Sequence, residues 1–527
     1  MKKILTYIMI GSLAIGATAC KKTLDINDNP NSPTSSTSEL VLPQSLVGTG
    51  AMVSTYNNGL TYPGGFFANV YGFGAYGATV TINYSSANFT ALWTSAYDVA
   101  EDYQYVIDNT TGNASLANSN SIARIMKSFV FSKLVDQYND VPYFEALKGA
   151  EFLTPKYDKA ADIYKDLVAQ LNLSIEQIEA AETAEGIASI SGEADPMFGG
   201  DMEEWKRFAN TLKLRLLIKM APVPELSGFA TTEFAAFDNA LGIIHDDALV
   251  NPGYTKQGGR LNPTYNLLAA DENNNRRVTS ALPTDWIYSF YDGTKLIDSA
   301  RGSVVFRDYP NTATNQLGQE NLKSDVIPPA GSTAWYTGRD FNTPGLGAVK
   351  GPAQGQVIML LSEAEFLLAE AITRGYLAGD AKAAFEAGIR SSISYLFEDQ
   401  TGAVSAADVN AALATYLTDN ENSFLVNFDL ATTPEQRIEA IITQKYIAMN
   451  VINCDEAFAE FRRTGFPRIV NGSSNPVLTF ASLQSTATSP DKLISRLPYP
   501  QVEYTLNQGN VPQNVNIFTQ KIFWDLN

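Results

Sequence analysis

Few residues of this chain could carry acid–base, nucleophilic or metal chemistry. It has one histidine, His245, and two cysteines, Cys20 and Cys454. Ordinary zinc and copper sites need several histidine or cysteine ligands, so neither metal is expected. His245 follows an apolar stretch and is interpreted as a buried or half-buried histidine, with no nucleophile elbow to accompany it. These residue types argue against metal-dependent and triad-based hydrolysis.

Cys20 has a different role, because it closes a short N-terminal leader. Lys2 and Lys3 start the leader, an apolar run follows, and small residues precede the cysteine. This is the layout of a bacterial lipoprotein signal peptide, and the run is shorter than the roughly 20 residues that span a bilayer. We predict that residues 1–19 are removed and that lipid on Cys20 holds the protein on a membrane surface. One departure is Ala17, where leucine is usual, and the alternative is an ordinary secretory leader.

The composition limits the classes of molecule that this protein could bind. The net charge is −19, which opposes binding to nucleic acid phosphates. Hydrophobic residues make up 45% of the chain and charged residues only 18%, so a large core is expected and global disorder is not. The chain is rich in aromatic residues, with 25 tyrosines and 27 phenylalanines, and some of these rings are expected on a binding surface.

The elements that would position a site are mostly helices. Helical periodicity begins at Leu92 and a second helix is expected near 122–137. Asp158, Asp201 and Thr433 are expected to cap further helices, the last one running to about residue 463. Residues 356–397 are typical of a helix–turn–helix unit that partly matches the tetratricopeptide pattern.

Two other segments are rich in turns and aromatic residues. Glycine interleaved with aromatic residues disfavours a helix over 48–90, and prolines, glycines and asparagines punctuate 226–350. We predict a mostly α fold: a helix-pair scaffold of tetratricopeptide type over about 90–225 and 355–470, carrying an irregular, loop-rich binding lobe. Residues 20–45 are a lipidated tether, and 46–527 form a single domain.

Several motifs, taken in order, resemble one family from end to end. The chain resembles the SusD/RagB-type outer-membrane nutrient-binding lipoproteins of the Bacteroidetes. The motifs are Asp25-Ile-Asn-Asp-Asn-Pro-Asn31, Gly200-Asp201 with Trp205, Phe208 and Arg215, Glu363 with Glu370 and Arg374, Gln444-Lys445, Phe461-Arg462-Arg463, Arg496-Leu497-Pro498, and Trp524-Asp525.

The resemblance implies a non-catalytic protein without a cofactor. It would capture an oligosaccharide or other nutrient and pass it to a SusC-type TonB-dependent transporter in the outer membrane. Arg374, Arg462 and Arg463 are then interpreted as helix-end or interhelix pairs rather than ligand contacts. Sugars need aromatic platforms beside fixed polar groups, and an unpaired buried hydroxyl costs about 1–3 kcal/mol. The predicted ligand contacts are Tyr71, Phe73, Tyr76, Tyr84, Trp286, Tyr291, Trp335, Tyr336, Arg339 and Asp340.

Other interpretations stay open. Any one of these rings could instead pack in the core or between lobes. The cargo could be a peptide or glycopeptide, and the protein could be purely structural. A surface glycoside hydrolase would need two carboxylates about 5–10 Å apart, and no such pair stands out in the sequence.

Overall fold

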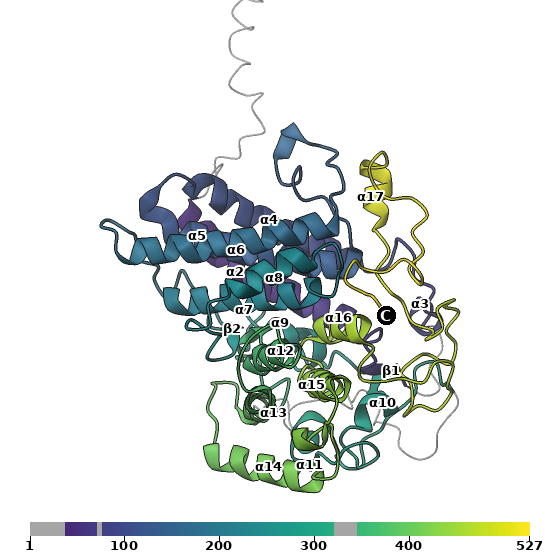
Figure 1. Ribbon diagram of the computed structural model, residues 1–527. Coiled ribbons are helices and arrows are strands. Elements are labelled where there is room, and N and C mark those ends of the chain that lie inside the picture. The colour runs from purple at the N-terminus through teal and green to yellow at the C-terminus, as the bar shows by residue number, and fades with distance from the viewer. Residues whose placement is uncertain (1–36, 71–75, 321–344) are drawn as a thin grey trace, which may run out of the picture.

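The computed structural model describes residues 37–70, 76–320 and 345–527, and the fold is mostly helical, as predicted. Its long helices form two groups, one above the other in Figure 1, and irregular chain runs along their right side. In the upper group each helix packs against the next one in the sequence, and in the lower group most consecutive helices do so. This arrangement is the helix-pair scaffold expected from the sequence.

The upper group contains the first long helices, each of which contacts the next. The helices are α2 (Ser38–Gly59), α4 (Thr90–Thr110), α5 (Ala117–Tyr138), α6 (Ala160–Glu182), α7 (Met202–Met220) and α8 (Ser227–Ala235). The α7 helix begins as predicted, because the Asp201 carboxylate accepts hydrogen bonds from the amides of Glu203 and Glu204.

Helix α2 corrects the expected boundaries, which placed a tether up to residue 45 and loops from residue 48. The segment is helical despite Pro43 and three glycines. A Cβ atom at Gly59 would lie 2.8 Å from the Leu92 side chain, so glycine lets α2 approach α4 closely. Leu46 and Val53 are fully buried in the same interface. Tertiary packing therefore outweighs the low helix propensity of this segment.

The lower group follows later in the chain. It consists of α12 (Leu361–Thr373), α13 (Ala381–Phe397), α14 (Ala406–Asp419), α15 (Pro434–Ala448) and α16 (Cys454–Thr464). Thr433 forms the predicted capping box with Gln436. The single helix predicted to residue 463 is instead two helices, because the chain turns at Val451, where φ is 65°.

The pair α12 and α13 shows why a small residue is needed in this scaffold. A Cβ atom at Gly388 would lie 2.6 Å from the Phe366 ring. No real Cβ contact is that short, so only glycine lets the two helices meet at this point. Asp380 caps α13 by accepting hydrogen bonds from the amides of Lys382 and Ala383.

Short elements build the irregular lobe. Strand β1 (Phe67–Asn69) pairs antiparallel with β3 (Ala281–Pro283), and β2 (Ala248–Val250) pairs antiparallel with β4 (Gln356–Met359). The remaining elements are α3 (Ala78–Thr81), η1 (Ala114–Leu116), η2 (Gly149–Glu151), α9 (Pro263–Leu268), α10 (Asp285–Tyr288), α11 (Ser299–Val305), η3 (Phe428–Leu430) and α17 (Gln501–Leu506).

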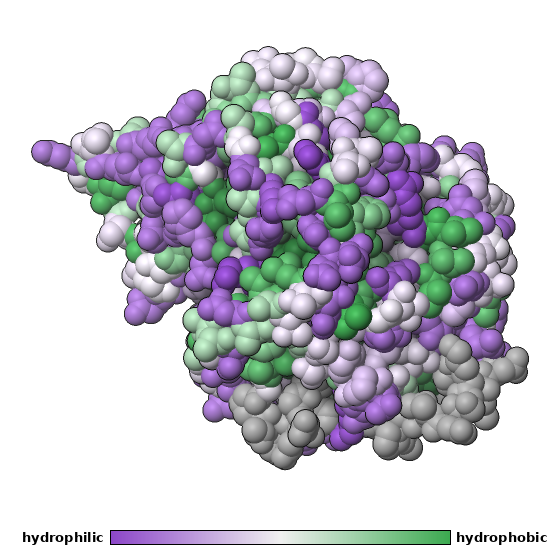
Figure 2. Space-filling model, turned by 60° about the horizontal axis from the view of Figure 1, so that its bottom comes forward, coloured by the Kyte–Doolittle hydropathy of each residue, from purple (hydrophilic) through white to green (hydrophobic). Residues whose placement is uncertain are grey.

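A single large cluster of buried hydrophobic residues extends through both helix groups. The groups also touch directly, through α7 with α12 and α2 with α16. Among the described residues, no helix has the length and apolar character needed to cross a membrane. On the face shown in Figure 2, hydrophilic side chains surround smaller hydrophobic areas.

Candidate functional site

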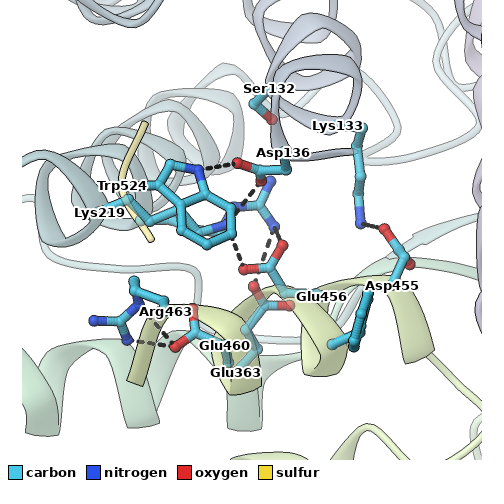
Figure 3. A network of polar contacts seen from close by, with 12 residues as sticks. Ser132, Lys133, Asp136, Lys219, Glu363, Asp455, Glu456, Glu460, Arg463 and Trp524 are labelled. Atoms are coloured by element: carbon cyan, nitrogen blue, oxygen red, sulfur yellow. Dashed lines mark hydrogen bonds and ion pairs between the residues drawn. The ribbon is translucent and has the colours of Figure 1, made fainter. Parts of the chain in front are cut away.

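Charged residues from four helices meet in the interior of the scaffold (Figure 3). The Lys219 ammonium on α7 lies 2.8 Å from Asp136 on α5 and 2.9 Å from Glu456 on α16. Arg215, also on α7, lies 3.1 Å from Glu363 on α12. These side chains are all at most 3% exposed. We call them, with the residues of the next paragraph, the buried charge network.

The network continues through the arginine pair of α16. The Arg463 guanidinium bridges Glu370 and Glu460, and its nearest Glu370 oxygen is 2.6 Å away. Arg374 lies 2.7 Å from the same Glu370. Arg462 instead donates hydrogen bonds to backbone carbonyls, including that of Asp136 at 2.9 Å. The interpretation as helix-end or interhelix pairs holds for Arg374 and Arg463, whereas Arg462 bonds backbone carbonyls.

Two carboxyls of the buried charge network have strongly shifted pKa values. Burial alone would raise the pKa of the Glu456 carboxyl, but Lys219 and Arg215 hold the pKa well below its ordinary value. The arginines around Glu370 lower the pKa of that carboxyl to about 2 against the effect of burial. Both carboxylates therefore stay ionised and fixed, away from solvent. This arrangement stabilises the scaffold and offers no exposed acid or base to a ligand.

Two of the predicted ligand contacts lie in the core, which corrects the expectation that they are exposed on loops. Trp286 is 1% exposed and packs against Phe290 and Phe480. The Lys295 ammonium lies 3.2 Å from the centroid of the Trp286 ring. Tyr291 is fully buried, and its hydroxyl accepts a hydrogen bond from Asn450. Neither ring can present its face to a ligand in this structure.

Tyr76 and Tyr84 lie nearer the surface, both half-buried. The Tyr76 hydroxyl donates to the Ser280 carbonyl at 2.6 Å and accepts from the Val70 amide at 3.1 Å. Tyr84 packs edge-to-face on Phe89 and borders a recess of only about 10 Å³. A recess of this size holds at most one water molecule, so the described residues do not by themselves form a sugar-sized pocket here.

The other predicted contacts, and the predicted lipid site Cys20, lie outside the described residues. They are Tyr71, Phe73, Trp335, Tyr336, Arg339 and Asp340. In the sequence, these residues lie in 71–75 and 321–344, which shortly follow Asn69 and Gln319, two residues that contact each other. The buried Asn69 side chain donates to the Gln319 carbonyl at 2.9 Å and accepts from the Gly318 amide at 2.8 Å. Asn69 and the chain at Gly318 and Gln319 therefore lie side by side.

Asn69 is a positioning residue that the sequence did not reveal. Its side chain is fully buried, and its backbone carbonyl accepts a hydrogen bond from Asn315 at 2.6 Å. These contacts tie the end of β1 to a segment about 250 positions later in the chain. A single asparagine beside aromatic residues carries no pattern from which such a contact could be predicted.

Comparison with known proteins identifies this arrangement. A family model described as starch-binding and associating with the outer membrane matches residues 66–500. The chain belongs to the SusD-like family. No curated protein matches it significantly.

Solved structures of other proteins are similar to this fold over almost the whole length of the chain. A chitin-binding SusD homologue from Flavobacterium johnsoniae is 21% identical, with a TM-score of 0.66, and the match covers 92% of this chain and 99% of that one. A SusD homologue from Bacteroides uniformis is 22% identical, with a TM-score of 0.65 and the same coverage. A chitin-binding protein is 24% identical, with a TM-score of 0.64, and the match covers 93% and 99% of the two chains.

For this SusD-like chain, most of the motifs that carried the resemblance belong to the scaffold. Arg215, Glu363, Glu370 and Arg463 all lie in the buried charge network. The interpretation of His245 as a buried or half-buried residue is wrong. Its side chain is 62% exposed, and its Nδ1 lies 3.5 Å from a Glu204 carboxylate oxygen. Among the described residues, no group of histidine, cysteine and acidic side chains is arranged to hold a metal ion.

A second group of charged residues lies where β4 leads into α12. The Asp247 carboxylate accepts a hydrogen bond from the Leu361 amide at 2.7 Å. Burial raises the pKa of Asp247, Glu365 and Glu398 to about 7 each. Asp246 adds to the rise at Asp247, and Asp247 adds to the rise at Glu365 and Glu398. Lys350 opposes the rise at Asp247 and Glu398. These three carboxyls titrate near neutral pH in the folded protein.

We expect these three carboxyls to make the free energy of unfolding depend on pH. A carboxyl whose pKa is higher in the folded state contributes stability that is complete below its unfolded pKa and is lost as the pH rises through its folded pKa. Stability should therefore fall between about pH 4.5 and 7, and Glu365→Gln should flatten that fall. Thermal unfolding across this range measures it. The matched control is Glu386→Gln on the surface of α13, and an identical slope in all three proteins would contradict the assignment.

Proposed function

We propose that this protein is a non-catalytic glycan-binding lipoprotein of the outer membrane. It is anchored through Cys20, captures an oligosaccharide at the cell surface and passes it to a SusC-type TonB-dependent transporter. The match of residues 66–500 to the SusD-like model carries the proposal, and the two solved relatives named as chitin-binding support a carbohydrate ligand.

We expect the ligand to bind at the predicted contacts, six of which lie in residues 71–75 and 321–344, including Trp335 and Arg339. Asn69 contacts Gln319, and these two residues shortly precede the two segments in the sequence. The aromatic and charged residues of these segments are of the types that supply the stacking surface and the polar partners that a sugar requires.

A glycan screen of the purified protein tests this function. We expect saturable binding to one glycan class, with chito-oligosaccharides and malto-oligosaccharides as the first probes and no products released on long incubation. Release of shorter sugars would instead indicate a glycoside hydrolase. Binding of peptides or glycopeptides without any glycan binding would indicate the alternative cargo.

The proposed partner and anchor need a separate test. Affinity capture of the protein from membranes of its host should recover a β-barrel transporter, and Cys20→Ser should release the protein from the membrane fraction. Capture without any transporter would contradict the hand-off, and unchanged membrane retention of Cys20→Ser would contradict the lipid anchor.

A further inference from the structure

A polar cavity of about 590 Å³ lies in the upper helix group, away from the loop-rich lobe. Its walls are α4, α5, α6 and the chain just after α5. Small-molecule sites in proteins usually have volumes of about 300–1,000 Å³. In Figure 1 these helices lie at the upper left, whereas β1, α3 and α10 lie on the right. The cavity is thus distinct from the site built around Asn69.

Two cations on α5 line this cavity, one helical turn apart. The Arg124 guanidinium donates to Asn120 at 2.7 Å and to Gln170 at 2.5 Å, and the Lys127 ammonium donates to Gln104 at 2.5 Å. All three acceptors are neutral amide oxygens. Within the described residues, no carboxylate lies within ion-pair distance of Arg124 or Lys127. Their hydrogen bonds are therefore partly satisfied, and their charges are offset only by the more distant carboxylates Asp166 and Asp108.

The charge of the lining is unusual for this protein. The chain carries a net charge of −19, yet the cavity is lined by Arg124, Lys127 and Lys148 against the carboxylates Asp108 and Asp166. Burial lowers the pKa of Lys127 to about 8, Asp166 and Asp108 oppose the fall, and Arg124 and Lys148 add to it. An anion placed between Arg124 and Lys127 would relieve this repulsion.

The remaining lining residues suit the hydroxyl groups and apolar face of a sugar. Asp166 accepts a hydrogen bond from the Tyr143 hydroxyl at 2.6 Å, which fixes that carboxylate at the wall. Gln104 and Gln170 line the cavity with amide groups that also bond its cations and carboxylates, and Phe144 at the lining is 45% exposed. An exposed ring beside fixed polar groups is the combination expected of a saccharide site.

We propose that this cavity is a second saccharide site, selective for an acidic sugar that carries a carboxylate or a sulfate ester. The anionic group binds between Arg124 and Lys127, and the hydroxyls face the amides and carboxylates of α4 and α6. The proposal takes its ligand class from the proposed function, but it uses residues that the first site does not. Two separate sites on one protein would hold a long acidic glycan more firmly than either site alone.

Calorimetric titration with galacturonate, galactose 6-sulfate and galactose tests the proposal. We expect saturable binding of at least one acidic sugar, weaker at higher salt, and no binding of galactose at this site. Lys127→Met should weaken the acidic sugar about tenfold or more, because a charge-assisted hydrogen bond is lost. Galacturonate and galactose 6-sulfate separate a carboxylate ligand from a sulfate ligand.

Two further variants make the result specific. Lys165→Met removes a lysine of α6 that pairs with Asp162, outside the cavity lining, and should leave binding unchanged. Phe144→Ala truncates an exposed ring and should weaken binding without unfolding the protein. Lys127→Met loses a hydrogen bond to Gln104 and contacts with the Phe131 and Tyr143 rings, so circular dichroism must show that this variant is folded at the temperature of the titration.

The outcomes separate this site from the proposed function. Acidic-sugar binding that depends on Lys127 supports the cavity even if the neutral-glycan screen finds nothing. Neutral-glycan binding with no response to either acidic sugar overturns the cavity and leaves the proposed function standing. Binding that is equal in the original protein and Lys127→Met, or binding of acidic peptides alone, also overturns it.

Discussion

Lys219→Met is expected to destabilise the protein by about 3–5 kcal/mol, because it removes the cation nearest to two buried carboxylates. The Lys219 ammonium lies within 3 Å of both Asp136 and Glu456, and the three side chains are at most 3% exposed. Asp136 keeps hydrogen bonds from Trp524, at 2.8 Å, and from Tyr164, but these are neutral donors. Chemical unfolding followed by circular dichroism measures the loss.

Surface lysines provide the control for Lys219. Lys159 lies 2.7 Å from Asp140, the same ion-pair geometry, but its side chain is 76% exposed. Lys159→Met should therefore cost at most about 1 kcal/mol. The double variant of Lys219→Met with Glu456→Gln should be less destabilised than the sum of the two single changes. Equal, small losses at Lys219 and Lys159 would show that the network does not hold the helices together.

Trp286→Ala is expected to cost about 3–5 kcal/mol, as is usual for removing a large buried aromatic ring. The ring is enclosed by Phe290, Phe480 and the Lys295 ammonium. Burial lowers the pKa of Lys295 to about 7, and the indole face is the nearest group that stabilises its charged form. Losing the ring therefore leaves a cavity and removes the nearer of two aromatic rings from the Lys295 ammonium, the other being Phe290 at 4.3 Å. Thermal and chemical unfolding give the magnitude.

Trp286→Phe is the matched variant, because it keeps an aromatic ring in the same place. It should lose less stability than Trp286→Ala and should leave glycan binding intact. A Trp286→Ala protein that is fully stable but no longer binds glycan would mean that this ring faces the ligand and that the core assignment is wrong.

The sequence predicted much of the scaffold, because helical periodicity and caps are local signals. Residues 90–110 and the helix capped by Asp201 form as expected, and Thr433 caps a helix that ends at Ala448 rather than near residue 463. Asp158 was predicted to cap α6 but instead accepts hydrogen bonds from the amides of Tyr143 and Phe144, each at 2.8 Å. A side chain with two nearby sets of donors cannot be assigned from the sequence alone.

The ligand site was harder to predict, because an aromatic ring in a loop serves binding and packing equally well. Trp286 and Tyr76 stand in similar sequence surroundings, yet one is buried and the other lies half-exposed beside Val70. The contacts that decide the difference come from distant parts of the chain, such as Phe480 on Trp286 and Ser280 on Tyr76. Such long-range contacts cannot be predicted from the spacing or the periodicity of residues in the sequence.

Calorimetric titration of chito-oligosaccharides and the best glycan of the screen into the original protein, Trp335→Ala and Trp286→Phe tests the central claim most directly. We expect saturable binding by the original protein and by Trp286→Phe, and binding weakened about tenfold in Trp335→Ala at an unchanged melting temperature. A folded protein that binds no glycan at all would contradict the account.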